Sequence, residues 1–473
     1  MQRSDLLRTV ALVLFLLAFG LLWVSNRQGL LVPNPERNIA VPETLTIPFQ
    51  VRVAHNGSDI HFQYRWPADR PHLIHDVLRF EGGKWITYGK AVPGSQPEGL
   101  HEDRVAMMVD DGGVPEFSRY GGFVTIGNRL DGFTNGVTGE EAEAHPYFGN
   151  VRGQDAATKY LPATRTDSAD WGAVQPEDRL AQLRQAGYFL DLWHWRGNRG
   201  GPIGFADDQL VGESRDGDNG RSAWSTNWDG ENNRPKFMFD PVKTGYVALE
   251  WDAILNGTVD QDSAHYLHAN AMTEFDADHA WRDGDTLPRR VLREPEGSRA
   301  DIRAQGRWEN GYWTVTMSRA MDTGNPLDDK IFRDGGSYSV GFAVHRNATG
   351  GRWHYVSLPV SLGLGRDAEL PVAHFTGDRP PWDTQLWYEI TLFYPGQVSW
   401  PLLTSHAHAG SARIASGVPA HTYHTPEQLA QYGVEIEYAD AIIKQWRWTL
   451  IVGLLLFVTI GFTLLRSIRN QRG

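Results

Sequence analysis

The sequence predicts a mainly β protein, an antiparallel β-sandwich ectodomain with long loops that is flanked by two transmembrane helices. Short runs of alternating apolar and polar residues recur around glycine-containing turns, whereas amphipathic helical stretches are few. An apolar run also lies near each end of the 473-residue chain. The alternation predicts the sandwich, and the two apolar runs predict the membrane helices.

Three hairpins carry the prediction of a sandwich. Each consists of two alternating runs about a short turn, and the alternation buries one face of each strand. They occupy residues 46–66, with the turn at Asn56-Gly57-Ser58, residues 307–319, with the turn at Asn310-Gly311, and residues 337–365.

Helices are predicted at two places, residues 176–187 and residues 425–446. The region from about His101 to Gly245 is long, rich in glycine and aspartate, and poorly periodic. Long loops on a sandwich often carry the ligand site, so we expect the functional residues there. After Trp400 the alternation stops and His, Ala and Gly accumulate, which predicts a separate appendage.

The two ends are predicted to anchor the chain in the inner membrane. The run from Val10 to Val24 lacks a small-x-small cleavage site, which favours an uncleaved anchor. The run from Trp448 to Leu465 has 18 residues without a charge, close to the ~20 that span a bilayer. Arginines outside both runs place both termini in the cytoplasm and the large domain in the periplasm. The predicted divisions are the N-terminal tail and anchor (1–27), the sandwich (28–400), the His-rich appendage and helix (401–445), and the second membrane helix with its tail (446–473).

Composition excludes several classes of protein. The chain has no cysteine, which excludes disulfides, thiolate metal sites and haem attached through thioether bonds. Its net charge is −12, and the first and last eight residues together carry +4, which leaves −16 on the region between them. An acidic body argues against a nucleic-acid partner and suits either solubility or docking to a basic redox protein.

Two polar patterns resemble metal sites only weakly. The run from Asp216 to Gly220 begins like a calcium loop, but Asn227 stands where an EF-hand needs a bidentate glutamate, so we interpret it as a polar turn. Near the C-terminus, four histidines form a candidate copper or zinc site, with surface histidines as the alternative. They are His406, His408, His421 and His424.

The central region contains five candidates for cofactor binding. Met107 and Met108 are adjacent on a predicted strand, so one faces the core and the other the opposite side, where its thioether could ligate iron. His194, between two tryptophans, could ligate or flank a flat cofactor, and Arg196 could meet a carboxylate of that cofactor. Lys236 has aromatic neighbours, and burial among them would give the neutral amine that a metal requires. Packing in the core or at the surface is the alternative for each.

Four of these five residues lie in stretches that resemble a known family. HDVLRFEGGKW (from His75), EDRVAMMVDD, DLWHWR and PIGFADD occur in this order and resemble the haem-binding domain of ethylbenzene dehydrogenase-related proteins, over about residues 45–425. The resemblance implies a β-sandwich that binds haem b with Met and Lys as axial ligands. Met108 matches the methionine of the Asp-Arg-x-Ala-x-Met pattern, and Lys236 is the match for the lysine.

The chain departs from membrane-linked relatives that attach haem through Cys-x-x-Cys-His. Phe123, Ile126 and Gly127 fall at those three places, and a second such motif is reduced to its final histidine, His424. The resemblance therefore implies non-covalent haem b, or a chain that has lost its haem.

The sequence thus predicts a membrane-anchored haem b protein that relays electrons on the periplasmic side, with Met108 and Lys236 as axial ligands. Its partners would be a membrane- or quinone-linked donor or a molybdoenzyme complex, and a soluble carrier such as a cytochrome. The alternative is a haemless assembly subunit that binds a partner protein or a saccharide on the same sandwich. A metal-dependent oxidoreductase built on the four C-terminal histidines is a third hypothesis.

Overall fold

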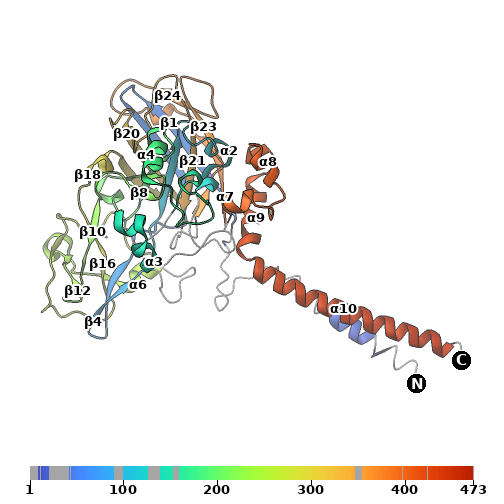
Figure 1. Ribbon diagram of the computed structural model, residues 1–473. Helices are drawn as coiled ribbons and strands as arrows, with labels where there is room; N and C mark the ends of the chain where they lie inside the picture. The colour runs from blue at the N-terminus through green and yellow to red at the C-terminus, as the bar shows by residue number, and fades with distance from the viewer. Residues whose placement is uncertain are drawn as a thin grey trace. The chain divides into compact units, whose positions relative to one another are not determined.

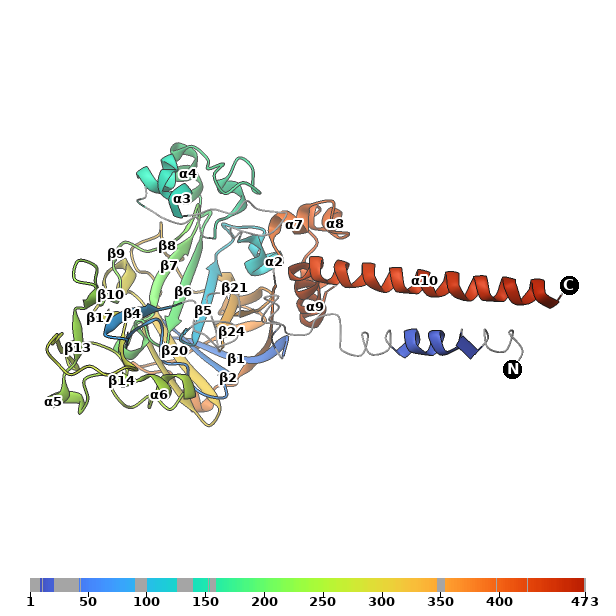
Figure 2. The same cartoon turned by 90° about the horizontal axis from the view of Figure 1, so that it is seen from below.

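The computed structural model describes residues 9–10, 12–20, 42, 44–89, 100–125, 139–151, 153, 159–346, 354–396, 398–422 and 424–471 (Figures 1 and 2). The chain forms two units, one of residues Thr44–Gln431 and one of the two ends, Met1–Glu43 with Tyr432–Gly473. The larger unit contains the sheets and all the sites discussed below.

A 13-stranded sheet forms the body of the larger unit. Its order is β19-β20-β2-β1-β24-β23-β21-β5-β6-β7-β8, while β22 pairs with β21 and β25, and β25 pairs with β1. The strands are β1 (Thr46–His55), β2 (Asp59–Pro67), β5 (Arg104–Asp110), β6 (Leu190–Arg196), β7 (Asp207–Val211), β8 (Arg215–Gly217), β19 (Arg303–Glu309), β20 (Tyr312–Ala320), β21 (Ser337–His345), β22 (His354–Val356), β23 (Val360–Leu364), β24 (Leu370–His374) and β25 (Tyr388–Phe393).

Six of these strands close into a barrel, in the order β1, β24, β23, β21, β22, β25 and back to β1. The prediction that the body is mostly strands is confirmed, but the simple antiparallel sandwich is corrected, because β24 pairs in parallel with both β1 and β23. Alternation along a strand reports which side chains are buried and carries no information about the neighbouring strand. A closed barrel and two packed sheets therefore give the same sequence pattern.

Aromatic side chains fill the core between facing strands of the large sheet. Phe62 of β2 meets Trp193 of β6 edge-on, with ring centroids 5.4 Å apart, and Phe49 of β1 packs on Phe342 of β21 at 5.3 Å. All four side chains are buried. Burying rings of this size supplies much of the hydrophobic stabilisation of such a body.

Smaller elements surround the large sheet. One additional sheet contains β3 (Val77–Glu81), β4 (Lys84–Tyr88), β14 (Leu249–Glu250) and β16 (Asp285–Pro288). Two-stranded pairs are β9 (Gly220–Arg221) with β18 (Glu296–Gly297), β10 (Trp224–Thr226) with β17 (Arg290–Leu292), β11 (Trp228–Asp229) with β12 (Arg234–Pro235), and β13 (Phe237–Phe239) with β15 (Met272–Glu274).

The helices are short apart from the last two. They are α2 (Phe117–Tyr120), α3 (Gly139–Ala144), α4 (Glu177–Gln185), α5 (Pro241–Thr244), α6 (Trp251–Asn256), α7 (Trp400–Thr404), α8 (Ser411–Ala415), α9 (Pro426–Glu437) and α10 (Ala439–Gln471), with 3-10 turns η2 (Gly121–Val124), η4 (Pro162–Thr164), η5 (Gly201–Ile203), η6 (Ser298–Ala300), η7 (Trp382–Thr384) and η8 (Ala420–Thr422) and the π-helix η3 (Pro146–Val151). Helix α4 lies where residues 176–187 predict it.

The described residues contain one helix that is long and apolar enough to cross a membrane, Ala439–Asn470. Its 32 residues have a mean hydropathy of 2.3 over the most apolar stretch. Within the part of the chain that the structure describes, the two predicted spans are therefore corrected to one, the C-terminal span. Within the N-terminal run, residues 10 and 12–20 are helical, and residues 21–24 lie outside the described residues.

Candidate functional site

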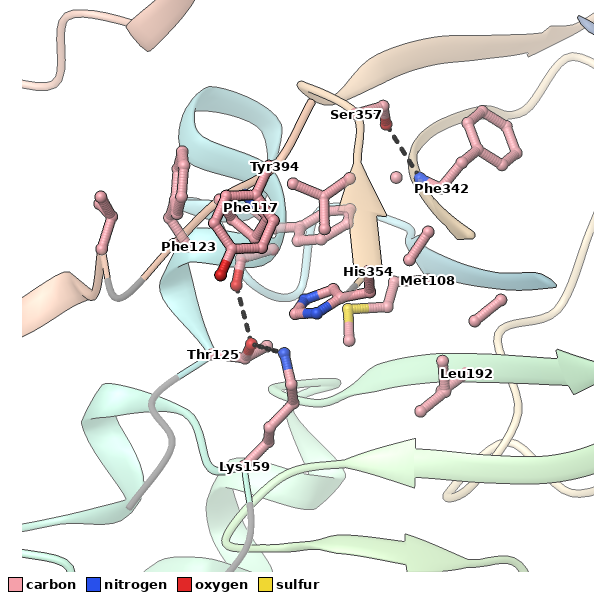
Figure 3. A pocket seen from close by; sticks show the side chains of 18 residues that line it. Met108, Phe117, Phe123, Thr125, Lys159, Leu192, Phe342, His354, Ser357 and Tyr394 are labelled. Atoms are coloured by element: carbon pink, nitrogen blue, oxygen red, sulfur yellow. Dashed lines mark hydrogen bonds between the residues drawn. The ribbon is translucent and has the colours of Figure 1, made fainter. Parts of the chain in front are cut away.

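A cavity of about 260 Å³ opens on the outer face of β5, β6 and β21. Its other walls are α2, η2, β22 and the segment after β25. Most of the lining is apolar or aromatic, and three side chains offer a sulfur or nitrogen atom. The principal lining residues are Ala106, Met108, Phe117, Phe123, Thr125, Lys159, Leu192, Gly341, Phe342, His354, Ser357 and Tyr394 (Figure 3).

Strand pairing places Met108 at this cavity and Met107 in the core. Met108 lies opposite Gly341 on one side and Leu192 on the other, and both line the cavity. Met107 points to the opposite face of β5, where the hydroxyl of Tyr64 lies 3.3 Å from its sulfur. The predicted division of the pair between two faces is therefore observed, with Met108 on the side away from the core.

Lys159 enters the cavity close to Met108 and was not foreseen from the sequence. Its Nζ donates a hydrogen bond of 3.1 Å to Oγ1 of Thr125, which also lines the cavity. Burial, with a smaller contribution from Arg215, lowers the pKa of Lys159 to about 8. With this pKa about one amine in ten is neutral at pH 7 and about half are neutral at pH 8, and only a neutral amine can ligate a metal.

A row of three imidazoles runs from the cavity along the same face of the sheet. His354 lines the cavity beside Met108 (Figure 3) and pairs across the strands with His345. The rings of His354 and His345 are nearly parallel, with centroids 5.3 Å apart, and His194 follows at 6.2 Å. Burial, reinforced by nearby arginines, lowers the pKa of His194 and of His345 well below the usual range. Both rings are thus neutral.

Arginines surround the far end of this row. Arg196 donates to Oδ2 of Asp207 at 2.7 Å and approaches Nδ1 of His194 at 3.1 Å, and Arg215 approaches the same nitrogen at 2.7 Å. A guanidinium can only donate, so Nδ1 of His194 accepts and Nε2 carries the proton of the neutral ring. In this state His194 holds two cations in place and cannot ligate a metal.

Lys236 lies away from this cavity. It is exposed, in the link between β12 and β13, and its backbone N–H donates to the carbonyl of Asn227 at 2.8 Å. Its aromatic neighbours therefore do not bury it, which agrees with the surface position given as the alternative for this residue. The structure brings Met108 and Lys159 together, places His194 and Arg196 further along the same face, and leaves Lys236 and Met107 elsewhere.

The four C-terminal histidines are not gathered into one metal-binding set. In the described chain, groups of three or more potential ligands occur at two places, and neither includes these residues. His408 is buried with Nδ1 3.0 Å from the carbonyl of Leu403, whereas His406 and His421 are exposed.

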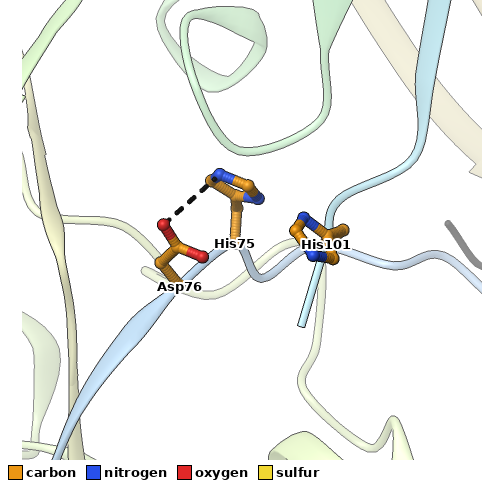
Figure 4. A group of neighbouring side chains, drawn as sticks. All are labelled: His75, Asp76 and His101. Carbon is orange, nitrogen blue, oxygen red and sulfur yellow. Dashed lines mark ion pairs between the residues drawn. The ribbon is translucent and has the colours of Figure 1, made fainter. Parts of the chain in front are cut away.

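One of those two groups is His75, Asp76 and His101 (Figure 4). Nε2 of His75 lies 3.6 Å from Oδ2 of Asp76, and the two imidazoles are 5.0 Å apart between ring centroids. The other group is Asp191, Asp208 and Asp329, on the core side of the sheet.

Comparison with known proteins fits this geometry. A family model described as ethylbenzene dehydrogenase matches residues 23–357, which is more than half of the chain. The chain belongs to the ethylbenzene dehydrogenase family. The family binds haem, and this member has no cysteine to attach it covalently. Cytochrome c-552 of Stutzerimonas stutzeri is 35% identical over 91 residues, which is 19% of this chain and 30% of that protein. The chain thus matches less than a third of that relative.

Two residues that line the cavity, His354 and Lys159, were not identified from the sequence around them. A signal for His354 exists in the sequence, because it stands with His345 in the predicted 337–365 hairpin, and the pairing of β21 with β22 sets the two residues opposite each other. Lys159 carried no such signal, because its partner Thr125 comes from a distant segment.

Proposed function

We propose that this chain binds one haem b in the cavity at Met108 and transfers single electrons through it. The observation that carries the proposal is the shared cavity of a thioether and two nitrogen bases, His354 and Lys159, in a member of a haem-binding family. Thioether and neutral nitrogen are ligands that suit haem iron. The absence of cysteine leaves non-covalent binding as the mode.

The residues around the cavity suit this role. When bound, haem supplies a reversible one-electron couple, and a methionine ligand raises its potential. Phe117, Phe123 and Tyr394 exclude water from the cavity walls. Arg215, close enough to lower the pKa of Lys159, and Arg196 provide positive charge for the carboxylates of the haem.

Two residues compete to be the second ligand. His354 is the base whose ring lies beside the sulfur of Met108 (Figure 3), whereas the Met and Lys pair implied by the family resemblance favours Lys159. We propose Met108 with one of these two nitrogens, in place of Met108 with Lys236. An amine and an imidazole on iron give different electron paramagnetic resonance spectra, and substituting each base separately identifies the ligand.

The partners proposed from the family are redox proteins. The family includes a subunit of a molybdoenzyme complex, so this chain would relay electrons between such a complex, or a membrane-linked donor, and a soluble carrier. The net charge of −16 between the tails favours a basic carrier. Three arginines, Arg466, Arg469 and Arg472, follow the apolar stretch of α10 in the sequence, which favours a cytoplasmic position for that end and a periplasmic one for the body.

The test compares two neighbouring methionines in the full-length protein in detergent. Met108→Leu removes the proposed ligand, and Met107→Leu is a matched control of the same size in the core. We expect haem affinity to fall at least about tenfold in Met108→Leu, with an altered reduced α band, and both to stay unchanged in Met107→Leu. Identical spectra in the two variants would remove Met108 from the iron.

A further inference from the structure

We propose that the aspartate group of Asp191, Asp208 and Asp329, with Asp218 beside it, binds a divalent cation, with Ca²⁺ as the best fit, on the core side of the sheet that carries the cavity. The proposal does not depend on haem binding. The sequence drew attention only to Asp218, as part of a polar turn, whereas the structure buries this residue to 3% exposure.

Strand register brings the carboxylates of Asp191, Asp208 and Asp218 to one face. Asp208 lies opposite Trp193 in the pairing of β6 with β7, and Asp191 lies opposite Leu210. Gln209 pairs with Gly217, so Asp218 follows opposite Asp208, and its N–H donates to the carbonyl of Asp208 at 3.1 Å. Paired residues point to the same side of a sheet. This side is the core side, since Trp193 packs there on Phe62.

One guanidinium partly neutralises the group. Arg319 of β20 donates to Asp191 at 2.7 Å, to Asp208 at 3.2 Å and to Asp329 at 2.5 Å. All four of these side chains are fully or almost fully buried. Within the described residues no ion pair joins Asp218 to Arg319, so Asp218 adds a fourth carboxylate, and the four aspartates with this one guanidinium carry a formal charge of −3.

The buried carboxylate of Asp218 is a second observation that points to a cation. Neither of its carboxylate oxygens has a hydrogen-bond partner in the described part of the chain, although both are buried. Oδ1 of Asp191 and Oδ1 of Asp208 are also buried without a partner. A buried carboxylate oxygen without a donor costs several kcal/mol, so four such oxygens on one face call for a cation. Burial and the neighbouring carboxylates of Asp191 and Asp329 raise the pKa of Asp218 to about 9, which is consistent with this excess of negative charge.

The net charge around this group differs from the net charge around the other potential metal site. Around His75, Asp76 and His101, the carboxylates of Asp76 and Glu102 already have four arginine partners. A dication there would add to an excess of positive charge, whereas at Asp218 it would offset a negative one. We therefore place the cation at the aspartates.

Oxygen ligands alone indicate the class of ion. Carboxylates without histidine or thiolate suit hard cations, and Ca²⁺ accepts irregular sets of carboxylate oxygens and waters, whereas Mg²⁺ requires a near-octahedral set. The site would fasten β6, β7 and the end of β8 to one another across the face that packs against β20.

The experiment titrates Ca²⁺ and Mg²⁺ into the full-length protein in detergent after treatment with a chelator, and follows Tm and heat of binding. Asp218→Asn removes one charge and keeps the shape of the side chain. Asp322→Asn, at an exposed position, is the matched control. We expect Ca²⁺ to raise Tm of wild type and of Asp322→Asn, and to bind Asp218→Asn at least about tenfold more weakly.

Terbium provides a second readout that does not require unfolding. Trp193 packs on Arg319 at 4.7 Å and lies opposite Asp208, so it can sensitise Tb³⁺ luminescence at the site. We expect Ca²⁺-displaceable emission in wild type that is lost in Asp218→Asn. The proposal is overturned if Ca²⁺ leaves Tm and emission unchanged while Asp218→Asn alone stabilises the protein, because Asp218 then holds a proton in place of a metal. Haem content, measured in parallel, separates failure here from failure of the proposed function.

Discussion

Lys159 makes the stability of the haem-free protein depend on pH. Its pKa is lowered to about 8 in the folded chain, against ~10.4 in an unfolded one. Between these values the unfolded chain binds more protons, so the free energy of unfolding rises with pH across this window. Below about pH 8 both states are protonated and the cost of burying the charge is fully present.

Lys159→Met tests this dependence. We expect the variant to be about 1–2 kcal/mol more stable than wild type at pH 7, allowing for solvent screening of a partly exposed chain, and the difference to shrink as pH approaches 10. Urea denaturation of both proteins at several pH values measures it. Parallel curves for the two proteins would contradict a depressed pKa.

The face of the sheet to which a side chain points could be predicted where its strand could be predicted. The adjacency of Met107 and Met108 on one strand required that they face opposite sides, and the resemblance selected Met108, which lines the cavity. Lys236 was the match for the ligand lysine that the resemblance implies, and its side chain is exposed. Contacts across distant segments decide burial, and Lys159 and Thr125 make such a contact.

The cavity depends on a glycine in strand β21, Gly341, whose missing side chain leaves room for it. Gly341 lies opposite Met108, and a Cβ placed there would come within 3.2 Å of Cζ of Phe117. The backbone of Gly341 is not in the left-handed region, so larger residues cost space and little backbone strain.

Two substitutions of Gly341 should therefore reduce the volume of the cavity in two steps. We expect Gly341→Ala to retain most haem uptake and Gly341→Val to lose most of it, while circular dichroism shows both proteins folded. Haem titration followed by absorbance measures the loss. Full uptake by a folded Gly341→Val protein would show that the haem does not use this cavity.

The strands themselves were largely predictable, and their arrangement was not. Alternation located the hairpin of β1 with β2 and that of β19 with β20, because each local turn fixes its register. The parallel pairing of β24 with β1 joins segments more than 300 residues apart. No local pattern encodes that contact, so the barrel was missed.

For the whole molecule, the described residues support one membrane helix, α10. Ending the chain after Glu437 should release the protein from membranes into the soluble fraction with its haem retained, because the cavity lies in the unit Thr44–Gln431. Membrane flotation of the truncated and full-length proteins measures this. A truncated chain that still floats with membranes would restore the second predicted span, near the N-terminus.

The haem content of the purified full-length protein shows whether this cysteine-free member of the family carries haem. The protein, made with an adequate haem supply, should show a Soret band and contain one acid-extractable haem b per chain, with a reduced α band that reoxidises reversibly. A folded protein without a Soret band after haem is supplied would show that the chain does not bind haem, and would favour the haemless binding subunit.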